Sequence, residues 1–154
     1  MYSAITSILP EPPEELKAVS AELANLIGAE IRLNGPVPFS KYMEMALYEP
    51  RLGYYSAGLR KFGEGGDFVT APQLGNVFAR CLAVQIEQLA GGLDHYEIIE
   101  AGAGSGILAA DLLEALQENH PPTRYLILER SAYLRQVQKE TLSQHVPKWM
   151  DRIC

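Results

Sequence analysis

Residues 96–113 read YEIIEAGAGSGILAADLL, and this stretch decides the fold. A short apolar strand is expected at 96–100 and an apolar-rich helix at about 107–117, with Gly102, Gly104 and Gly106 between them. Glycines at alternate positions let the backbone turn tightly and leave room for a ligand. The helix that follows presents unpaired N–H groups with partial positive charge at its start. The turn therefore predicts a binding site for a ligand that carries an anion or a carboxylate.

The chain beyond this turn continues the same alternation. A proline pair precedes a second expected strand at 125–128, and Ser131 is expected to cap a helix that reaches about residue 144. This order predicts an α/β fold with two parallel strands, a right-handed crossover and covering helices. Glu129 closes the second strand, 23 residues beyond Gly106. An acidic side chain at that place accepts hydrogen bonds from the hydroxyls of an adenosine ribose.

Two classes of cofactor use this geometry. Gly104, Gly106 and Ala109 satisfy the loose G-x-G-x-x-A pattern of dinucleotide-binding sites. Glu100 stands against that interpretation, because a carboxylate near a pyrophosphate adds like-charge repulsion. The same carboxylate would favour S-adenosyl-L-methionine (SAM), whose ammonium and sulfonium groups are positive. The string E-x-G-x-G-x-G therefore favours SAM, and a nicotinamide-dependent oxidoreductase is the less favoured alternative.

Residues 1–92 are expected to form an N-terminal arm and a helical cap. The proline-rich start predicts an extended arm. Apolar periodicity predicts helices at 14–34, at 42–47 with Ser40 as N-cap, and at 78–89 with Cys81 on the buried face. The stretch 50–72 is dense in glycine and aromatic residues, which favours a shaped binding loop over a mobile surface linker.

The composition excludes several classes of function. The 154 residues are 47% hydrophobic and 21% charged, which is typical of a globular protein with one core. A net charge of −6 disfavours nucleic acid as the main partner. No apolar run is long enough for a membrane span, and residues 1–15 lack the basic residues of a targeting segment, so a cytoplasmic location is expected. The cysteines and histidines lack metal-ligand spacing, and no metal site is expected.

Several motifs, taken in order, resemble the MidA-like family of SAM-dependent methyltransferases. They are GPVPFSKYMEMALYEPRLGYY at 35–55, FG at 62–63, GDFVTAP at 66–72, EAGAGSGILAADLL at 100–113, and the segment 125–131. The resemblance spans roughly residues 31–144. It implies a class I methyltransferase fold, with a Rossmann-like parallel sheet and an N-terminal helical cap whose segment 66–70 lies against the cofactor and substrate cleft.

The resemblance also implies an activity and roles for the residues of the turn. Eukaryotic members of the family are mitochondrial proteins that methylate an arginine of a respiratory complex I subunit during its assembly. The implied substrate is a protein, with a complex I subunit as one candidate. Gly102, Gly104 and Gly106 would approach the methionine end of SAM, Glu100 would lie near its amino group, and Glu129 would hold the ribose.

The catalytic group is less well defined by the sequence. An arginine nucleophile needs a carboxylate that orients its guanidinium, and Asp67 is the candidate, with a turn-forming role as the alternative. Thr70 belongs to the same family segment and is a substrate-pocket candidate. Tyr54 and Tyr55 could line the substrate channel, although packing in a core would explain these aromatic residues equally well.

This chain is shorter than the members of the family that it resembles, which are more than twice as long. Residues 93–154 are therefore expected to be the first half of a SAM-binding domain whose C-terminal half is absent, so that the chain ends before a third strand. A two-stranded parallel sheet leaves an uncovered edge, which predicts self-association through the strand 96–100. A non-catalytic interaction or assembly fragment is the main alternative to an active methyltransferase.

Overall fold

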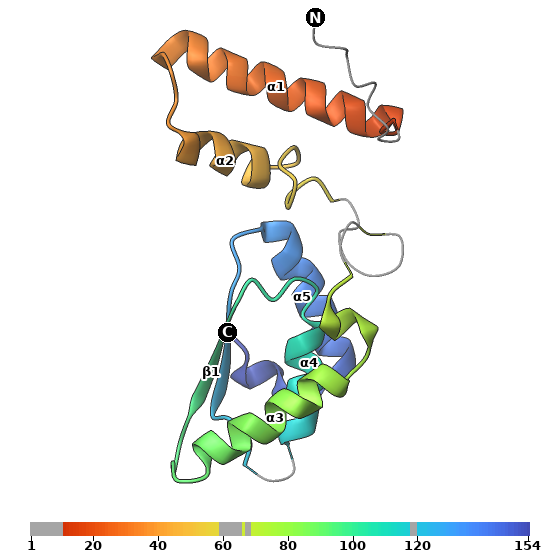
Figure 1. The fold of residues 1–154 in the computed structure, drawn as a ribbon, viewed down its shortest axis with the longest axis vertical. Helices are drawn as coiled ribbons and strands as arrows, with labels where there is room; N and C mark the ends of the chain where they lie inside the picture. Colours follow the sequence, from red (N-terminus) through yellow and green to blue (C-terminus); the bar gives the residue numbers. More distant parts are fainter. Residues whose placement is uncertain (1–10, 59–65, 67–68, 118–119) are drawn as a thin grey trace, which may run out of the picture. The chain divides into compact units, whose positions relative to one another are not determined.

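The computed structural model describes residues 11–58, 66, 69–117 and 120–154. They form two compact units that divide between Ala57 and Gly58 (Figure 1). The helix at 77–90, which the sequence grouped with the N-terminal cap, packs within the second unit, because it lies against the helix that follows the glycine turn.

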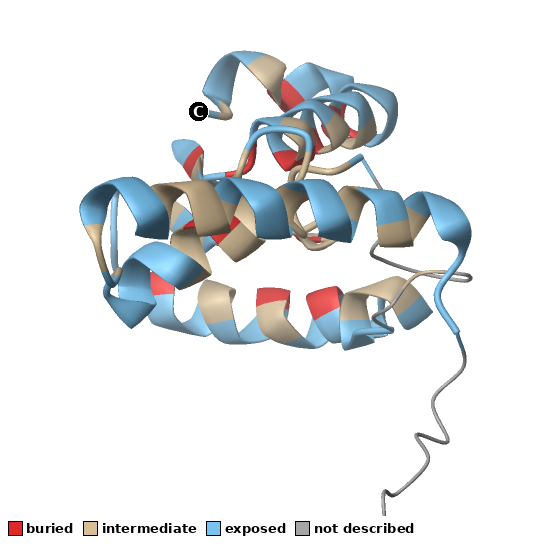
Figure 2. Ribbon diagram, turned by 90° about the horizontal axis from the view of Figure 1, so that it is seen from above, coloured by how far each residue is buried: buried red, intermediate tan, exposed pale blue. Residues whose placement is uncertain are grey.

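The first unit pairs two helices, α1 (Glu14–Asn34) and α2 (Phe39–Tyr48). The long helix α1 contains no buried residue (Figure 2). The expectation that Ser40 caps the second helix is wrong, because α2 begins at Phe39 with Pro38 as its N-cap. Pro38 already has the φ of −60° and the extended ψ of 150° that lead the chain into a helix, so Ser40 falls in the first turn.

The segment after α2 folds back onto that helix. The N–H groups of Tyr54 and Tyr55 donate to the carbonyls of Ala46 and Leu47, at 2.9 and 2.8 Å. The Tyr55 ring stacks on Tyr48, with the centroids 5.7 Å apart, and meets Tyr54 edge to face at 5.0 Å. This part of the expected loop is therefore a defined turn with its own aromatic cluster.

The second unit contains the predicted strand and helix alternation. Its elements are a 3-10 helix η1 (Ala71–Leu74), α3 (Val77–Ala90), β1 (Glu97–Ala101), α4 (Ile107–Leu116), β2 (Arg124–Leu128), α5 (Ala132–His145) and a 3-10 helix η2 (Pro147–Arg152). The two strands are parallel, with Ile98 opposite Tyr125 and Glu100 opposite Ile127. The predicted parallel pair is confirmed. Ser131 also caps α5 as expected, because its Oγ accepts from the Leu134 N–H at 3.2 Å.

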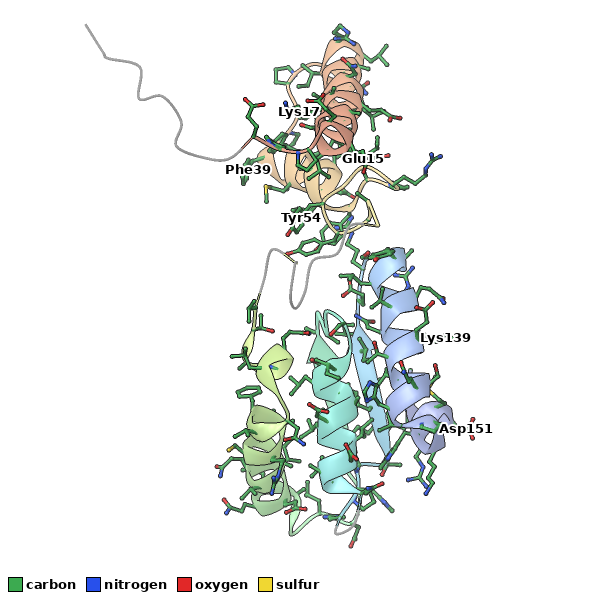
Figure 3. The ribbon with its side chains drawn as sticks, turned by 90° about the vertical axis from the view of Figure 1, so that its right-hand side faces the viewer. Glu15, Lys17, Phe39, Tyr54, Lys139 and Asp151 are labelled. Carbon is green, nitrogen blue, oxygen red and sulfur yellow. The ribbon has the colours of Figure 1, made fainter. Side chains whose placement is uncertain are left out.

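The core of this unit lies on one face of the sheet. Helices α3, α4 and α5 all lie on the same side of the two strands (Figures 1 and 3). Three leucines of α4 and Tyr125 are almost completely buried there, and Ile98 and Ile127 pack against them. Ile99 and Leu128 point to the opposite face, where they are 64% and 62% exposed. In the described residues this face has no covering helix.

The buried face of α3 agrees only in part with the predicted one. The helix directs Ala79 and Ala83 into the core, where they join Ala109 and Ala110 of α4, and this leaves Cys81 exposed. The expectation that Cys81 is buried is therefore wrong. Facing alanines allow two helices to approach closely. Leu82 and Ile86 of the predicted stripe pack beside them against the core, whereas Phe78 and Leu89 are exposed.

The last residues of the chain add to the sheet. Ile153 forms a parallel bridge with Tyr125, and the Cys154 N–H donates to the Tyr125 carbonyl at 3.0 Å. The Cys154 carbonyl accepts from the Ile127 N–H at 2.8 Å. In the described residues the sheet has two strands, and α5 and η2 return the chain to the free edge of β2, where Ile153 forms an isolated bridge and no third strand. No helix in the part of the chain that the structure describes is long and apolar enough to cross a membrane.

Candidate functional site

The glycine turn lies at the carboxyl end of β1 and leads directly into α4. Gly102, Gly104 and Gly106 have φ values of 70°, 56° and 82°, which lie in the left-handed region that L side chains rarely adopt. The Gly102 N–H donates to the carbonyl of Leu128 at the end of β2, at 2.9 Å, so the turn is attached to both strands. A Cβ on Gly102 would meet no atom within 4 Å, which leaves open space beside the backbone.

A cavity of about 210 Å³ lies against this turn. Thr70, Pro72 and Gln73 line it from the segment before α3, and Glu100 lines it from β1. The remaining lining residues belong to the turn and to the first residues of α4: Gly102, Ala103, Gly104, Ser105, Ile107 and Leu108. The structure therefore brings four predicted site residues together at one cavity, namely Thr70, Glu100, Gly102 and Gly104.

Glu100 presents a half-buried carboxylate in this cavity. Its Oε2 accepts a hydrogen bond from the Tyr125 hydroxyl at 2.8 Å. Burial raises the pKa of Glu100, and the hydrogen bond from Tyr125 partly opposes that rise. Burial and the nearby Glu100 charge in turn raise the pKa of the Tyr125 hydroxyl. A carboxylate whose charged form is under-solvated gains most from a cationic ligand, which can replace the lost hydration.

The raised pKa of Glu100 predicts how stability changes with pH. The folded state holds the Glu100 proton more tightly than the unfolded chain, whose carboxyl has the ordinary pKa of 4.5. The resulting stabilisation is complete below that value and is lost as the pH rises through the folded-state pKa. We expect the unfolding free energy of the wild type to fall relative to that of Glu100→Gln over this range. Urea titrations between about pH 4 and pH 8 measure the difference, and a pH-independent difference would contradict the prediction.

Glu129 lies at the carboxyl end of the neighbouring strand, outside the lining of the 210 Å³ cavity. Its Oε1 accepts from the Ser131 N–H at 2.8 Å, and its Oε2 accepts from the Gln138 side chain at 3.3 Å. The same Gln138 amide nitrogen donates to the Gly104 carbonyl at 3.0 Å. Glu129 is therefore linked to the glycine turn through one side chain of α5.

Sequence reasoning missed Gln138 and Gln73. Gln138 occupies a buried position between Leu134 and Leu142 of α5, and a polar residue within an apolar i, i+4 series was the available signal. Gln73 donates from Nε2 to Ser105 Oγ at 2.8 Å and thereby joins η1 to the glycine turn. No pattern in the sequence distinguishes Gln73 from a solvated residue, because its partner lies 32 positions away.

The other predicted substrate residues are not tested at this cavity. Asp67, the catalytic candidate, lies outside the described residues. Tyr54 and Tyr55 belong to the first unit, and their role in a substrate channel stays a prediction. Among the residues that the structure describes, no three His, Cys, Asp or Glu side chains are grouped as metal ligands.

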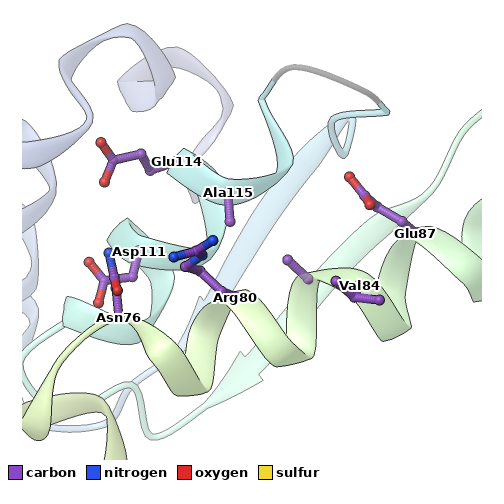
Figure 4. Close-up of a pocket in the computed structure, with 8 residues that line it drawn as sticks. Asn76, Arg80, Val84, Glu87, Asp111, Glu114 and Ala115 are labelled. Atoms are coloured by element: carbon purple, nitrogen blue, oxygen red, sulfur yellow. The ribbon is translucent and has the colours of Figure 1, made fainter.

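A second cavity, of about 370 Å³, lies between α3 and α4. Arg80 points from α3 toward Asp111 and Ala115 of α4, and Glu87 and Glu114 also line it (Figure 4). Burial and the nearby Glu114 charge raise the pKa of Asp111, and His145 opposes that rise. Side chains of both charges line this cavity, and neither the glycine turn nor a strand end contributes to it. We therefore assign the cavity no part in cofactor binding.

A protein-family profile matches residues 77–154, which include both strands and the glycine turn. The family is described as "Putative S-adenosyl-L-methionine-dependent methyltransferase". The matched segment is half of the chain.

Curated relatives are named as protein arginine methyltransferases. The mitochondrial protein arginine methyltransferase NDUFAF7 homolog of Drosophila melanogaster is 29% identical over 142 residues, and the match covers 84% of this chain and 32% of that protein. Mitochondrial NDUFAF7 of Bos taurus is 31% identical, with 86% of this chain and 31% of that protein covered. The chain thus spans about a third of the length of the curated relatives it matches.

Solved structures from Burkholderia thailandensis have the same fold over this length. A protein bound to S-adenosyl-homocysteine superposes with a TM-score of 0.82 at 42% identity, over 95% of this chain and 39% of that chain. A native crystal structure from the same organism gives a TM-score of 0.76 at 40% identity, over 95% of this chain and 37% of that chain.

Proposed function

This chain belongs to the family of S-adenosyl-L-methionine-dependent methyltransferases, and from that premise we propose that its glycine turn holds SAM for methyl transfer to an arginine side chain of a protein. The observation that carries the proposal is the arrangement of two carboxylates around the turn. Glu100 and Glu129 lie at the carboxyl ends of adjacent parallel strands, with Gly102 and Gly104 between them in the chain. Ligands of open α/β sheets bind at this end of the strands.

The residues of the chain fit the cofactor in charge and in shape. The half-buried Glu100 carboxylate offers negative charge to an ammonium or sulfonium group, and the open space at Gly102 admits close approach to the backbone. The α4 N-terminus has no side-chain cap, so its first N–H groups can donate to a carboxylate. Glu129 can accept from ribose hydroxyls, since a carboxylate has about four acceptor sites and the structure occupies two of them. Bound SAM would supply the electrophilic methyl group.

The comparisons with known proteins favour SAM over a dinucleotide as the cofactor. The family and the Burkholderia thailandensis protein bound to S-adenosyl-homocysteine both support SAM. The loose G-x-G-x-x-A match of Gly104, Gly106 and Ala109 has no comparable support. A carboxylate at Glu100 would also repel a pyrophosphate.

An arginine of a protein is the proposed methyl acceptor. The names of the curated relatives support a protein arginine substrate, and the net charge of −6 is compatible with a cationic acceptor. The family resemblance further suggests a subunit of respiratory complex I. Methylation of a purified complex I preparation with radiolabelled SAM, followed by mass spectrometry of the labelled arginine, would test this substrate.

Binding of S-adenosyl-homocysteine tests the proposed site. We expect calorimetric titration to detect this ligand and not NADH. Glu129→Ala is expected to weaken its binding about tenfold, since a hydrogen bond to a charged group contributes about 1.5 kcal/mol. Glu140→Ala, on the exposed side of α5, is the matched control and should bind normally. Binding of NADH alone, or of neither ligand, would contradict the proposal.

We also propose that the free edge of β1 pairs with a second copy of the chain or with a partner protein. Within the described residues β1 pairs only with β2, and Ile99 is exposed on it. An unpaired strand edge is a template for pairing with another chain. Sedimentation velocity at increasing concentration should show a dimer, and a monomer at every concentration would contradict this proposal. Loss of the dimer in an Ile99→Lys variant would locate the interface on this strand.

The cytoplasm is the location that we propose for this protein. The curated relatives are named as mitochondrial proteins of eukaryotes. Fractionation of cells that express the tagged protein distinguishes the two compartments.

A further inference from the structure

Gln138 is a buried polar residue in the middle of α5. Its relative exposure is 3%, and its neighbours along the same helix face, Leu134 and Leu142, are equally buried in apolar surroundings. A buried amide reduces stability unless hydrogen bonds compensate for its lost hydration. An aliphatic side chain would fill this position without any need for hydrogen bonds. The role of the Gln138 amide therefore follows from its hydrogen-bond partners.

Both partners of the amide belong to the proposed cofactor site. Nε2 of Gln138 donates to the Gly104 carbonyl at 3.0 Å and to Glu129 Oε2 at 3.3 Å. The other oxygen of Glu129 accepts from the Ser131 N–H at 2.8 Å. The carboxylate is therefore held from two directions, by the backbone at the start of α5 and by a side chain nearly two turns further along.

The backbone of Gln138 also contacts the turn. A Cβ added to Gly106 would lie 3.2 Å from Gln138 Cα and 3.4 Å from its Cβ and Cγ. The absence of a side chain at Gly106 is what allows α5 to approach closely enough for the amide to reach Gly104. Three features of the site therefore converge on this one residue: Gly104, Gly106 and Glu129.

We propose that Gln138 is a positioning residue that fixes the distance between the glycine turn and the Glu129 carboxylate. This inference rests on the proposed function, in which the turn receives the methionine end of SAM and Glu129 receives the ribose. A neutral amide suits the task because one nitrogen carries two N–H donors and adds no charge beside Glu129. A glutamate at this position would repel both acceptors, and an aliphatic residue would leave the carboxylate with one partner fewer.

Ligand discrimination tests this inference. S-adenosyl-homocysteine and its 2′,3′-dideoxyribose analogue are titrated into wild type and Gln138→Met, which keeps the length of the side chain and removes the donors. We expect the substitution to weaken binding of S-adenosyl-homocysteine about tenfold and to change binding of the dideoxy analogue less than twofold. The preference for the hydroxylated ligand should collapse, and the same collapse is expected for Glu129→Ala. Gln136→Met, an exposed position on the same helix, is the control and should keep the preference.

The outcomes distinguish a positioning role from a structural one. If Gln138→Met weakens both ligands equally, or neither, the inference is wrong even when the wild type binds as proposed. If the wild type binds neither ligand, the proposed function itself fails. Trp149 fluorescence, which reports on the core of this unit, shows whether the variant is folded. Gln138→Glu provides a second variant of almost identical shape, for which a larger selective loss of S-adenosyl-homocysteine is expected.

Discussion

Replacing Gly106 with alanine is expected to lower the free energy of unfolding by about 2–3 kcal/mol. Gly106 has a φ of 82°, and an L residue in the left-handed region costs about 1–2 kcal/mol. The added Cβ would also lie 3.2 Å from Gln138 Cα, a backbone atom that moves only if α5 moves. Displacing a packed helix adds about 1 kcal/mol or more.

Gly102→Ala is the matched control for this prediction. Gly102 has a similar φ of 70°, but its Cβ would meet no atom within 4 Å, so only the conformational cost applies. Urea titration followed by Trp149 fluorescence measures both variants, because this single tryptophan is buried in the core of the second unit. Equal losses in the two variants would show that the contact with Gln138 contributes nothing.

Replacing Gly53 with alanine is expected to lower the stability of the first unit by about 3 kcal/mol. The Cβ would lie 2.5 Å from the Glu49 nitrogen, 2.6 Å from the Tyr48 nitrogen and 2.7 Å from the Leu47 carbonyl carbon. All three are backbone atoms of the last turn of α2 and its cap, so no side-chain rotation relieves the overlap. Overpacking of this kind typically costs up to about 3 kcal/mol. The Gly53 N–H bond to the Glu49 carbonyl, at 2.7 Å, holds the two segments at this distance.

Replacing Gly28 with alanine provides a control that is expected to raise the stability of the first unit instead of lowering it. Gly28 lies inside α1, where alanine is favoured over glycine by about 1 kcal/mol. Its added Cβ would meet only the flexible end of Arg32, at 3.2 Å. Thermal unfolding followed by far-UV circular dichroism should move down for Gly53→Ala and up for Gly28→Ala. An unchanged midpoint for Gly53→Ala would contradict the prediction.

Local signals in the sequence predicted the central part of the second unit. The glycines between 101 and 107, the cap at Ser131 and the apolar strands each act over a few residues, and the structure contains each of them within a residue or two of the expected place. The helix 42–47 was located correctly, although its start was misassigned because Pro38 and Ser40 are both typical of helix beginnings. The buried face of α3 was only partly evident from periodicity, since Leu82 and Ile86 pack against the core with Ala79 and Ala83 whereas Cys81 is exposed.

The sequence by itself determined that a strand, a glycine turn and a helix form a parallel unit, and it identified Glu100 and Glu129 as the acidic residues at the ends of its strands. These features depend on neighbouring residues and on topology that such units share. Only the tertiary structure decided which side chains join them. Gln138 meets Gly104 across 34 residues and Gln73 meets Ser105 across 32, and both contacts exist because the helices pack in one particular orientation against the turn. Packing of this kind depends on the shapes of all the buried side chains together, and no local pattern encodes it.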